Sequence, residues 1–331
     1  MARGPARRQP GVGPVRRPVE GAAAPGRTRG ITGLVYQSIH GVTHWVDVGV
    51  QAALRRLEPT LERAGMGAQT APSPEREALL SALNGVMGDR LAADANPLAL
   101  PMELRQHGHA LDLAALRASG KATGKVLLLV HGLCMSDLGW CRNGHDHGQA
   151  LAPALGAAPV YAFYNSGLHI SHNGLALSRA LQTLVDRWPV PLQRLDIVGH
   201  SMGGLVARSA VAHAQQAGLG WPAQLTDLVT LGTPHHGAPL ERAGHWVDVV
   251  LGATPYAAPL ARLGKVRSAG ITDLRHGLDA DVGLPPGPRC WAIAGLLGEG
   301  DGKGARGLAP HVLGDGLVRL NSALSPRASI S

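Results

Sequence analysis

The chain has 331 residues, of which 45% are hydrophobic, so it can bury a large core and is not a disordered polymer. Its net charge is +8, but seven of its 31 basic residues and only one acid lie in residues 1–30. The excess of positive charge therefore belongs to an N-terminal tail and not to a groove. For this reason we expect no nucleic-acid partner.

Residues 1–30 are rich in Pro, Gly, Ala and Arg, a composition that predicts a disordered basic tail. The tail lacks the apolar run that a signal peptide requires. The cysteines, Cys134, Cys141 and Cys290, form no CxxC pair, which favours a reducing compartment and predicts a cytoplasmic protein. No run of eighteen apolar residues is present, so a membrane span is not expected.

Residues 31–96 are predicted to form a helical extension. From Ile31 to Leu57 apolar residues recur at spacings of three and four, which is typical of one helix face. This helix either docks on the main domain or lies on a lipid surface, and the second alternative would make the protein peripheral to a membrane. Residues 74–93 predict a second helix, with Pro74 at its start and Glu75 and Glu77 in its first turn.

From residue 97 to residue 331 strand and helix patterns alternate, which predicts an α/β domain with a mostly parallel sheet flanked by helices. "MELRQHGHALDL" alternates like a strand, and "GKVLLLVHG" reads as a strand buried on both faces. Further strands are predicted in "APVYAFYNS", "RLDIVG", "QLTDLVTLG" and "RCWAIAG", and helices in "GLALSRALQTLVDRW" and "MGGLVARSAVAHAQQAG". Residues 240–287 interrupt the alternation as a helical insertion, interpreted as a lid or as ordinary packing over the sheet.

The stretch "LDIVGHSMGGLVARSA" predicts a sharp turn from a strand into a helix with Ser201 at its apex. Such a turn exposes the serine hydroxyl as a nucleophile, and Gly199 and Gly203 leave room where strand and helix pass closely. The Met202 amide would lie in the first helical turn, where the positive end of the helix favours a developing oxyanion. Leu133, which follows "HG" at the end of an apolar strand, is the candidate for the second oxyanion donor. His131 and His200 are interpreted as structural residues.

The segments "LLLVHGL", "LDIVGHSMGGLVAR" and "LVTLGTPHHGAPLER" together resemble the α/β-hydrolase superfamily. Within it they are similar to bacterial triacylglycerol lipases and the PGAP1-like esterase/lipase group. The resemblance implies a serine hydrolase of small-molecule or lipid carboxylic esters, without a cofactor, using Ser, Asp and His in that chain order. It also assigns the acid to Asp315, in "GDGLV", and a structural role to the His235-His236 turn.

No histidine follows Asp315 in the sequence. Three explanations follow: a hydrolase truncated before its triad histidine, a pseudo-hydrolase that binds without turnover, or an enzyme that takes its base from elsewhere. His311, four residues before the acid, would need a rearrangement to serve. Two functions therefore stay open, ester hydrolysis through Ser201 and binding without catalysis.

Two other segments have compositions that suggest ligand binding. His145, Asp146 and His147 suggest a metal site, but no further ligand is evident nearby, so a loop or helix start is favoured and no metal is predicted. The glycine-rich residues 298–307 lack the ending of a phosphate-binding loop and are predicted to be a flexible linker.

Overall fold

The computed structural model describes residues 74–237, 268–278, 283 and 285–294. The predicted tail, the 31–57 helix, most of the 240–287 insertion, the 298–307 linker, His311 and Asp315 lie outside these residues. The chain divides into two compact units, Met1–Gly67 and Ala68–Ser331, and all described residues belong to the second. None of the described helices has the length and apolarity needed to cross a membrane.

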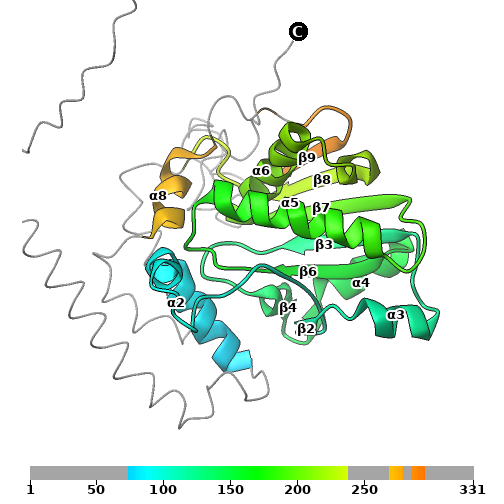
Figure 1. The fold of residues 1–331 in the computed structure, drawn as a ribbon, viewed down its shortest axis with the longest axis horizontal. Helices are drawn as coiled ribbons and strands as arrows, with labels where there is room; N and C mark the ends of the chain where they lie inside the picture. Colours follow the sequence, from blue (N-terminus) through cyan, green and yellow to red (C-terminus); the bar gives the residue numbers. More distant parts are fainter. Residues whose placement is uncertain (1–73, 238–267, 279–282, 284, 295–331) are drawn as a thin grey trace, which may run out of the picture. The chain divides into compact units, whose positions relative to one another are not determined.

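The centre of this unit is a seven-stranded sheet with the order β2-β1-β6-β3-β7-β8-β9 (Figure 1). Its strands are β1 (Glu103–Gln106), β2 (His109–Ala110), β3 (Lys125–Val130), β6 (Ala158–Phe163), β7 (Arg194–His200), β8 (Leu225–Leu231) and β9 (Arg289–Ile293). The strands from β6 to β9 in this order are parallel, and β1 is antiparallel to both of its neighbours. This is the expected mostly parallel sheet of the α/β-hydrolase type. Val130 pairs with Gly199, and Gly199 with Thr230, so β3, β7 and β8 end at one edge.

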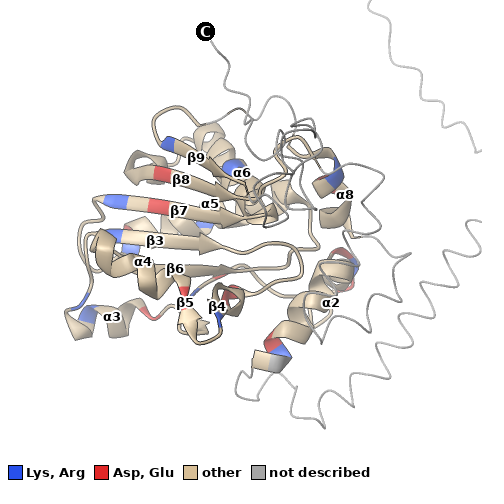
Figure 2. Cartoon of the chain, turned by 180° about the vertical axis from the view of Figure 1, so that it is seen from behind, with Lys and Arg blue, Asp and Glu red and all other residues tan. Residues whose placement is uncertain are grey.

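The described helices are α2 (Pro74–Ala93), α3 (Leu113–Ser119), α4 (His147–Leu155), α5 (Ile170–Arg187), α6 (Met202–Ala217) and α8 (Ala269–His276). Short elements complete the unit: the β4 (Cys141–Arg142) and β5 (His145–Asp146) hairpin and the 3-10 helices η2 (Asp137–Trp140) and η3 (Trp221–Gln224). Helices α5 and α6 lie on one face of the sheet, and α4 lies on the other (Figures 1 and 2). Because β3 is covered on both faces, its residues from Val126 to Val130 are buried, as its uninterrupted apolar sequence predicted.

The segment "MELRQHGHALDL" is not one strand but two, followed by a helix. His107 and Gly108 adopt positive φ angles of 50° and 76°, which turns the chain back on itself between β1 and β2. Asp112 then accepts hydrogen bonds from the amides of Ala114 and Ala115, both at 2.9 Å, and so begins α3. The alternating pattern therefore did not reveal the turn or the helix cap, because each involves only two or three residues.

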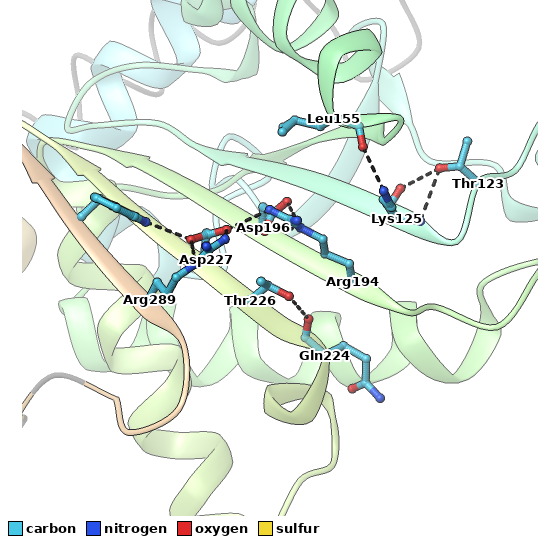
Figure 3. A network of polar contacts seen from close by, with 10 residues as sticks. Thr123, Lys125, Leu155, Arg194, Asp196, Gln224, Thr226, Asp227 and Arg289 are labelled. Carbon is cyan, nitrogen blue, oxygen red and sulfur yellow. Dashed lines mark hydrogen bonds and ion pairs between the residues drawn. The ribbon is translucent and has the colours of Figure 1, made fainter.

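An ion-pair network joins β7, β8 and β9 near their amino ends (Figure 3). The Asp227 carboxylate accepts from Arg194 Nη2 at 2.8 Å, from Arg289 Nη2 at 2.7 Å and from Trp291 Nε1 at 2.9 Å. Arg194 also donates to Asp196 at 2.7 Å. In Figure 2 the charged segments of β7 and β8 lie toward one end of their strands, while the opposite ends carry none. The network therefore stabilises the sheet at the edge opposite Ser201.

Replacing Asp227 by Asn is expected to lower the free energy of unfolding by about 1–2 kcal/mol at neutral pH, because two arginines lose their shared counter-charge while Arg289 stays largely solvated. Burial acts to raise the pKa of Asp227, but the hydrogen bonds from Arg289 and Trp291 and the charge of Arg194 outweigh it and lower that pKa. The contribution is therefore present above the carboxyl's unfolded pKa and is lost as pH falls through the folded value.

Urea unfolding at pH 7 and pH 3 measures this effect. The control is Asp186→Asn on the exposed side of α5, whose carboxylate accepts a hydrogen bond from the Gln182 side-chain amide and forms no ion pair with another described residue. If Asp227→Asn lowers the free energy of unfolding by as much at pH 3 as at pH 7, the result would contradict an electrostatic role for Asp227.

Candidate nucleophile site

Ser201 lies at the junction of β7 and α6, at the edge where the parallel strands end. Its backbone has φ 52° and ψ −121°, a combination that costs non-glycine residues about 1–3 kcal/mol and is found where a fold imposes it. The Ser201 amide donates to the Leu231 carbonyl at 2.8 Å, which ties the turn to the end of β8. The predicted strand, turn and helix are therefore present around this serine.

The two glycines beside Ser201 are required by close backbone contacts. A Cβ on Gly199 would lie 2.6 Å from the Cα of Gly204, because α6 turns back directly over β7. A Cβ on Gly203 would overlap the Val130 carbonyl oxygen and lie 2.5 Å from that of His131. The glycines at minus two and plus two thus let α6 pass against both β7 and the end of β3, as the sequence predicted.

Residues 132–137 follow β3 and lie beside the serine; they are here called the oxyanion loop, after the role predicted for Leu133. A Cβ on Gly132 would be only 3.2 Å from the Cβ of Ser201, so the loop and the nucleophile turn are in contact. Leu133 is the next residue and is buried. Neither its amide nor that of Met202 donates a hydrogen bond to another described residue. Their geometry is compatible with two oxyanion donors, which stays a prediction.

His131 is a buried structural residue at the end of β3. Its ring stacks on Tyr164 with centroids 4.2 Å apart, and its Nδ1 donates to the Gly132 carbonyl at 2.8 Å. Burial lowers the pKa of His131 to about 4, against the opposing effect of that hydrogen bond. The imidazole is therefore neutral at pH 7, and it orders the start of the oxyanion loop.

His235 is also held away from the nucleophile. Its Nδ1 accepts from Arg208 Nη1 at 2.9 Å, and its Nε2 lies 3.2 Å from Thr230 Oγ1, which in turn donates to the Trp291 carbonyl. Burial, and then the charge of Arg208, lower the pKa of His235 to about 3. The structural role that the resemblance assigned to this histidine agrees with these contacts.

A general base for Ser201 is not found within the described part of the chain. The Ser201 hydroxyl makes no hydrogen bond to any described residue. His200, beside it in sequence, lies with its Nδ1 3.2 Å from a Cβ placed on Gly132 and packs edge-on against Trp140. Asp315 and His311 lie outside the described residues, so the acid assigned to Asp315 stays a prediction.

The His145, Asp146 and His147 cluster forms a hairpin end and a helix start. Asp146 Oδ1 accepts from the Gln149 amide at 2.9 Å, which caps α4, and from the Tyr161 hydroxyl at 2.5 Å. These bonds use the carboxylate that a metal would need. The described residues contain no group of three or more His, Cys, Asp or Glu side chains arranged to hold a metal ion.

A family model described as "Domain of unknown function (DUF7379)" matches residues 100–277, more than half of the chain. The chain belongs to the DUF7379 family. The matched range contains the oxyanion loop, the Ser201 turn and α8, but not α2. No curated protein matches this DUF7379 member.

Solved structures similar to this DUF7379 member include bacterial and archaeal proteins. The mature lipase of Bacillus licheniformis is 19% identical, with 53% of this chain and 62% of the lipase covered and a TM-score of 0.35. A lipase-esterase related protein of Clostridium acetobutylicum is 12% identical, with coverages of 53% and 68% and a TM-score of 0.30. An esterase of Pyrococcus furiosus is 13% identical, with coverages of 52% and 72% and a TM-score of 0.32. The DUF7379 chain thus spans less than two thirds of the Bacillus lipase.

The structure also shows residues around the site that the sequence patterns did not indicate. The amide of Cys134 in the oxyanion loop donates to Ser166 Oγ at 3.0 Å, and Gly85 of α2 packs against the same cysteine. Ser166 follows β6, and Gly85 lies far upstream in a helix expected only as part of an extension. The spacing of Gly85 and Gly88 is a weak signal of close helix packing, and no motif pointed to Ser166.

Proposed function

We propose that this DUF7379 chain is a serine hydrolase of carboxylic esters, with Ser201 as the nucleophile. The observation that carries the proposal is the strained backbone of Ser201, held at φ 52° by bonds and close contacts from β8, β7 and β3. Strain of this kind at a strand-to-helix turn presents a hydroxyl at the end of a sheet. The support comes from the combination of this φ with a ψ of −121° at a turn flanked by Gly199 and Gly203.

In the proposed reaction Ser201 Oγ attacks the ester carbonyl carbon, and the carbonyl oxygen takes the negative charge. The amides of Leu133 and Met202 stabilise that oxyanion, aided by the positive end of α6. The base that takes the Ser201 proton returns it to the leaving oxygen, so that an alcohol departs, and water then cleaves the acyl-serine to a carboxylic acid and free Ser201. The proton of Ser201 needs a base, and Asp315 is the proposed acid that would orient it. Lipid esters are the substrate class proposed, and no cofactor is required.

A second candidate function is binding of an ester without turnover. It is favoured by one observation: within the described residues no hydrogen bond joins a histidine to the Ser201 hydroxyl. Loss of the base removes most of the rate that a triad supplies, while the oxyanion site and the pocket can still hold a ligand.

Hydrolysis of p-nitrophenyl butyrate and p-nitrophenyl palmitate by the full chain, with fluorophosphonate labelling in parallel, tests the proposal. Ser201→Ala is expected to lower kcat at least about 1,000-fold and to abolish labelling. The matched control is Ser119→Ala on exposed α3, which should keep the wild-type rate. Two results would reject ester hydrolysis through Ser201: hydrolysis that persists in Ser201→Ala, or a wild-type protein that neither hydrolyses the esters nor reacts with the probe. The second result would leave ester binding without turnover as the function.

A further inference from the structure

The oxyanion loop is held by contacts from outside its own strand. Cys134, in the middle of the loop, has a positive φ of 58°, which is costly for a residue with a side chain. Its amide is bonded to Ser166 Oγ, and its side chain is buried. Leu133 directly precedes Cys134, so a displacement of Cys134 would also move the Leu133 amide, which lies one peptide unit away.

Gly85 of α2 is in close contact with Cys134. A Cβ placed on Gly85 would lie 2.9 Å from both the Cα and the amide nitrogen of Cys134, and closer still to its Sγ. The absence of a side chain at residue 85 therefore lets the helix backbone rest directly on the loop backbone. The Gly85 carbonyl also accepts a hydrogen bond from Ser268 Oγ at 2.7 Å.

Ser268 connects Gly85 to α8. Its hydroxyl caps this helix by accepting from the Ile271 amide at 3.3 Å. The Ala269 amide donates to Asp89 Oδ2 of α2 at 3.0 Å, and the Gly270 amide donates to the Gly167 carbonyl at 3.0 Å. Helix α8 is thus attached both to α2 and to the segment after β6 that supplies Ser166.

The far end of the oxyanion loop is attached to α2 as well. Arg105 of β1 lies with its Nη1 3.2 Å from Glu77 Oε2 of α2 and 3.5 Å from Asp137 Oδ1, the last residue of the loop. Its guanidinium also stacks 3.4 Å from the Phe163 ring centroid. The Glu77 and Asp137 side chains are only 5% and 2% exposed, so this pairing is largely screened from water.

We propose that α2 and α8 form a brace that fixes the oxyanion loop, and that Gly85 is the positioning residue through which the brace acts. This inference rests on the proposed function for its catalytic consequence. Gly85 acts through its close contact with Cys134, and a displaced Cys134 moves the adjacent Leu133 amide. The helix ahead of the matched family range is therefore part of the catalytic unit.

The test is Gly85→Ala in the full chain, with kcat and KM for p-nitrophenyl butyrate and amide hydrogen exchange of residues 133–135. A displaced donor costs transition-state stabilisation and little substrate binding, so kcat should fall about 10- to 100-fold while KM changes less than about two-fold. The loop amides should exchange faster than in wild type. Adding Cys134→Gly removes Sγ, the nearest overlapping atom, and suits a positive φ, so it should restore part of kcat and of the protection although the backbone contacts remain.

Two further variants separate positioning from folding. Leu184→Ala removes a buried side chain of α5, outside α2 and α8, so it should lower the urea concentration at the midpoint of unfolding and leave kcat unchanged. Ser268 contacts Gly85 and also caps α8, so Ser268→Ala loosens the brace without adding an atom near Cys134. It should lower kcat several-fold and speed loop exchange even if Gly85→Ala does not fold.

The outcomes for the brace and for the enzyme are distinguishable. If wild type hydrolyses the ester and folded Gly85→Ala and Ser268→Ala keep its kcat and its loop protection, the brace is rejected and the enzyme stands. If wild type has no activity, exchange alone decides: faster exchange in Gly85→Ala that Cys134→Gly partly reverses supports the brace, and unchanged exchange rejects it.

Discussion

Acidification from pH 7 to pH 5 is expected to lower the free energy of unfolding by about 3–4 kcal/mol through His131 and His235 alone. Burial lowers the pKa of His131 to about 4 and, together with the charge of Arg208, that of His235 to about 3. Both rings stay neutral in the folded protein at pH 5. In the unfolded chain both take up a proton below about pH 6.5, which favours unfolding.

The sign follows from this difference in bound protons. The contribution of the two histidines to the free energy of unfolding is fully present above about pH 6.5. It declines as pH falls toward their pKa values in the folded state, by up to about 1.4 kcal/mol per pH unit for each histidine. For His235 the reason is geometric, since a proton on Nδ1 would face the Arg208 donor at 2.9 Å. The range from pH 7 to pH 5 lies above the titration of ordinary carboxylates, so their contribution is small.

Urea unfolding followed by circular dichroism at pH 7, 6 and 5 measures the effect. His131→Phe keeps an aromatic ring beside Tyr164 and should show about half of the wild-type pH dependence. His109→Gln, on the exposed β2 strand, is the matched control and should keep the full wild-type pH dependence of the free energy of unfolding. A wild-type change below about 1 kcal/mol over this range would contradict the assignment of two buried neutral histidines.

Gly203→Ala is expected to remove more than about 3 kcal/mol of stability, enough to unfold much of the protein. The added methyl group would overlap the Val130 carbonyl oxygen and lie 2.5 Å from that of His131. Both atoms belong to the backbone at the end of β3, which pairs with β6 and β7 and cannot give way without breaking the sheet. Loss of folded protein, and not only of activity, is therefore the expected result.

Two other glycines give graded controls in the same assay. A Cβ on Gly220 would meet no atom within 4 Å, and its φ is ordinary, so Gly220→Ala should change stability by less than about 0.5 kcal/mol. Gly218 is equally open but has a φ of 65°, so Gly218→Ala should cost about 1 kcal/mol. A Gly203→Ala variant as stable as Gly218→Ala would show that the turn does not need its glycine for packing.

The brace changes how the amino-terminal part of the chain is understood. Helix α2 was expected only as an extension ahead of the sheet domain, yet Gly85, Gly88 and Asp89 contact the loops at the active edge. A shortened chain that begins at the first strand would lose these contacts. Assays of the proposed esterase therefore need α2.

The order of strands and helices and the strand-to-helix turn at Ser201 followed from the sequence by itself. Uninterrupted apolar runs such as residues 126–130 predict a strand buried on both faces, and glycines at fixed distances from a serine predict a tight turn. These signals are local, because each depends on the periodicity or backbone freedom of neighbouring residues. The short β1–β2 hairpin was missed because its turn rests on His107 in a left-handed conformation, which few sequence patterns reveal.

Only the tertiary structure decided what surrounds the serine. The bond from Cys134 to Ser166 spans 32 residues, and that from Ser268 to Gly85 spans 183, so no pattern along the chain could have paired them. The same holds for Asp227, whose partners come from two neighbouring strands. It holds also for His235, whose pKa is lowered by burial and then by the charge of Arg208 of α6. Local backbone geometry depends on residues that are adjacent in the sequence. The burial of side chains, their pKa values and the positions of loops depend on which distant segments the fold brings into contact.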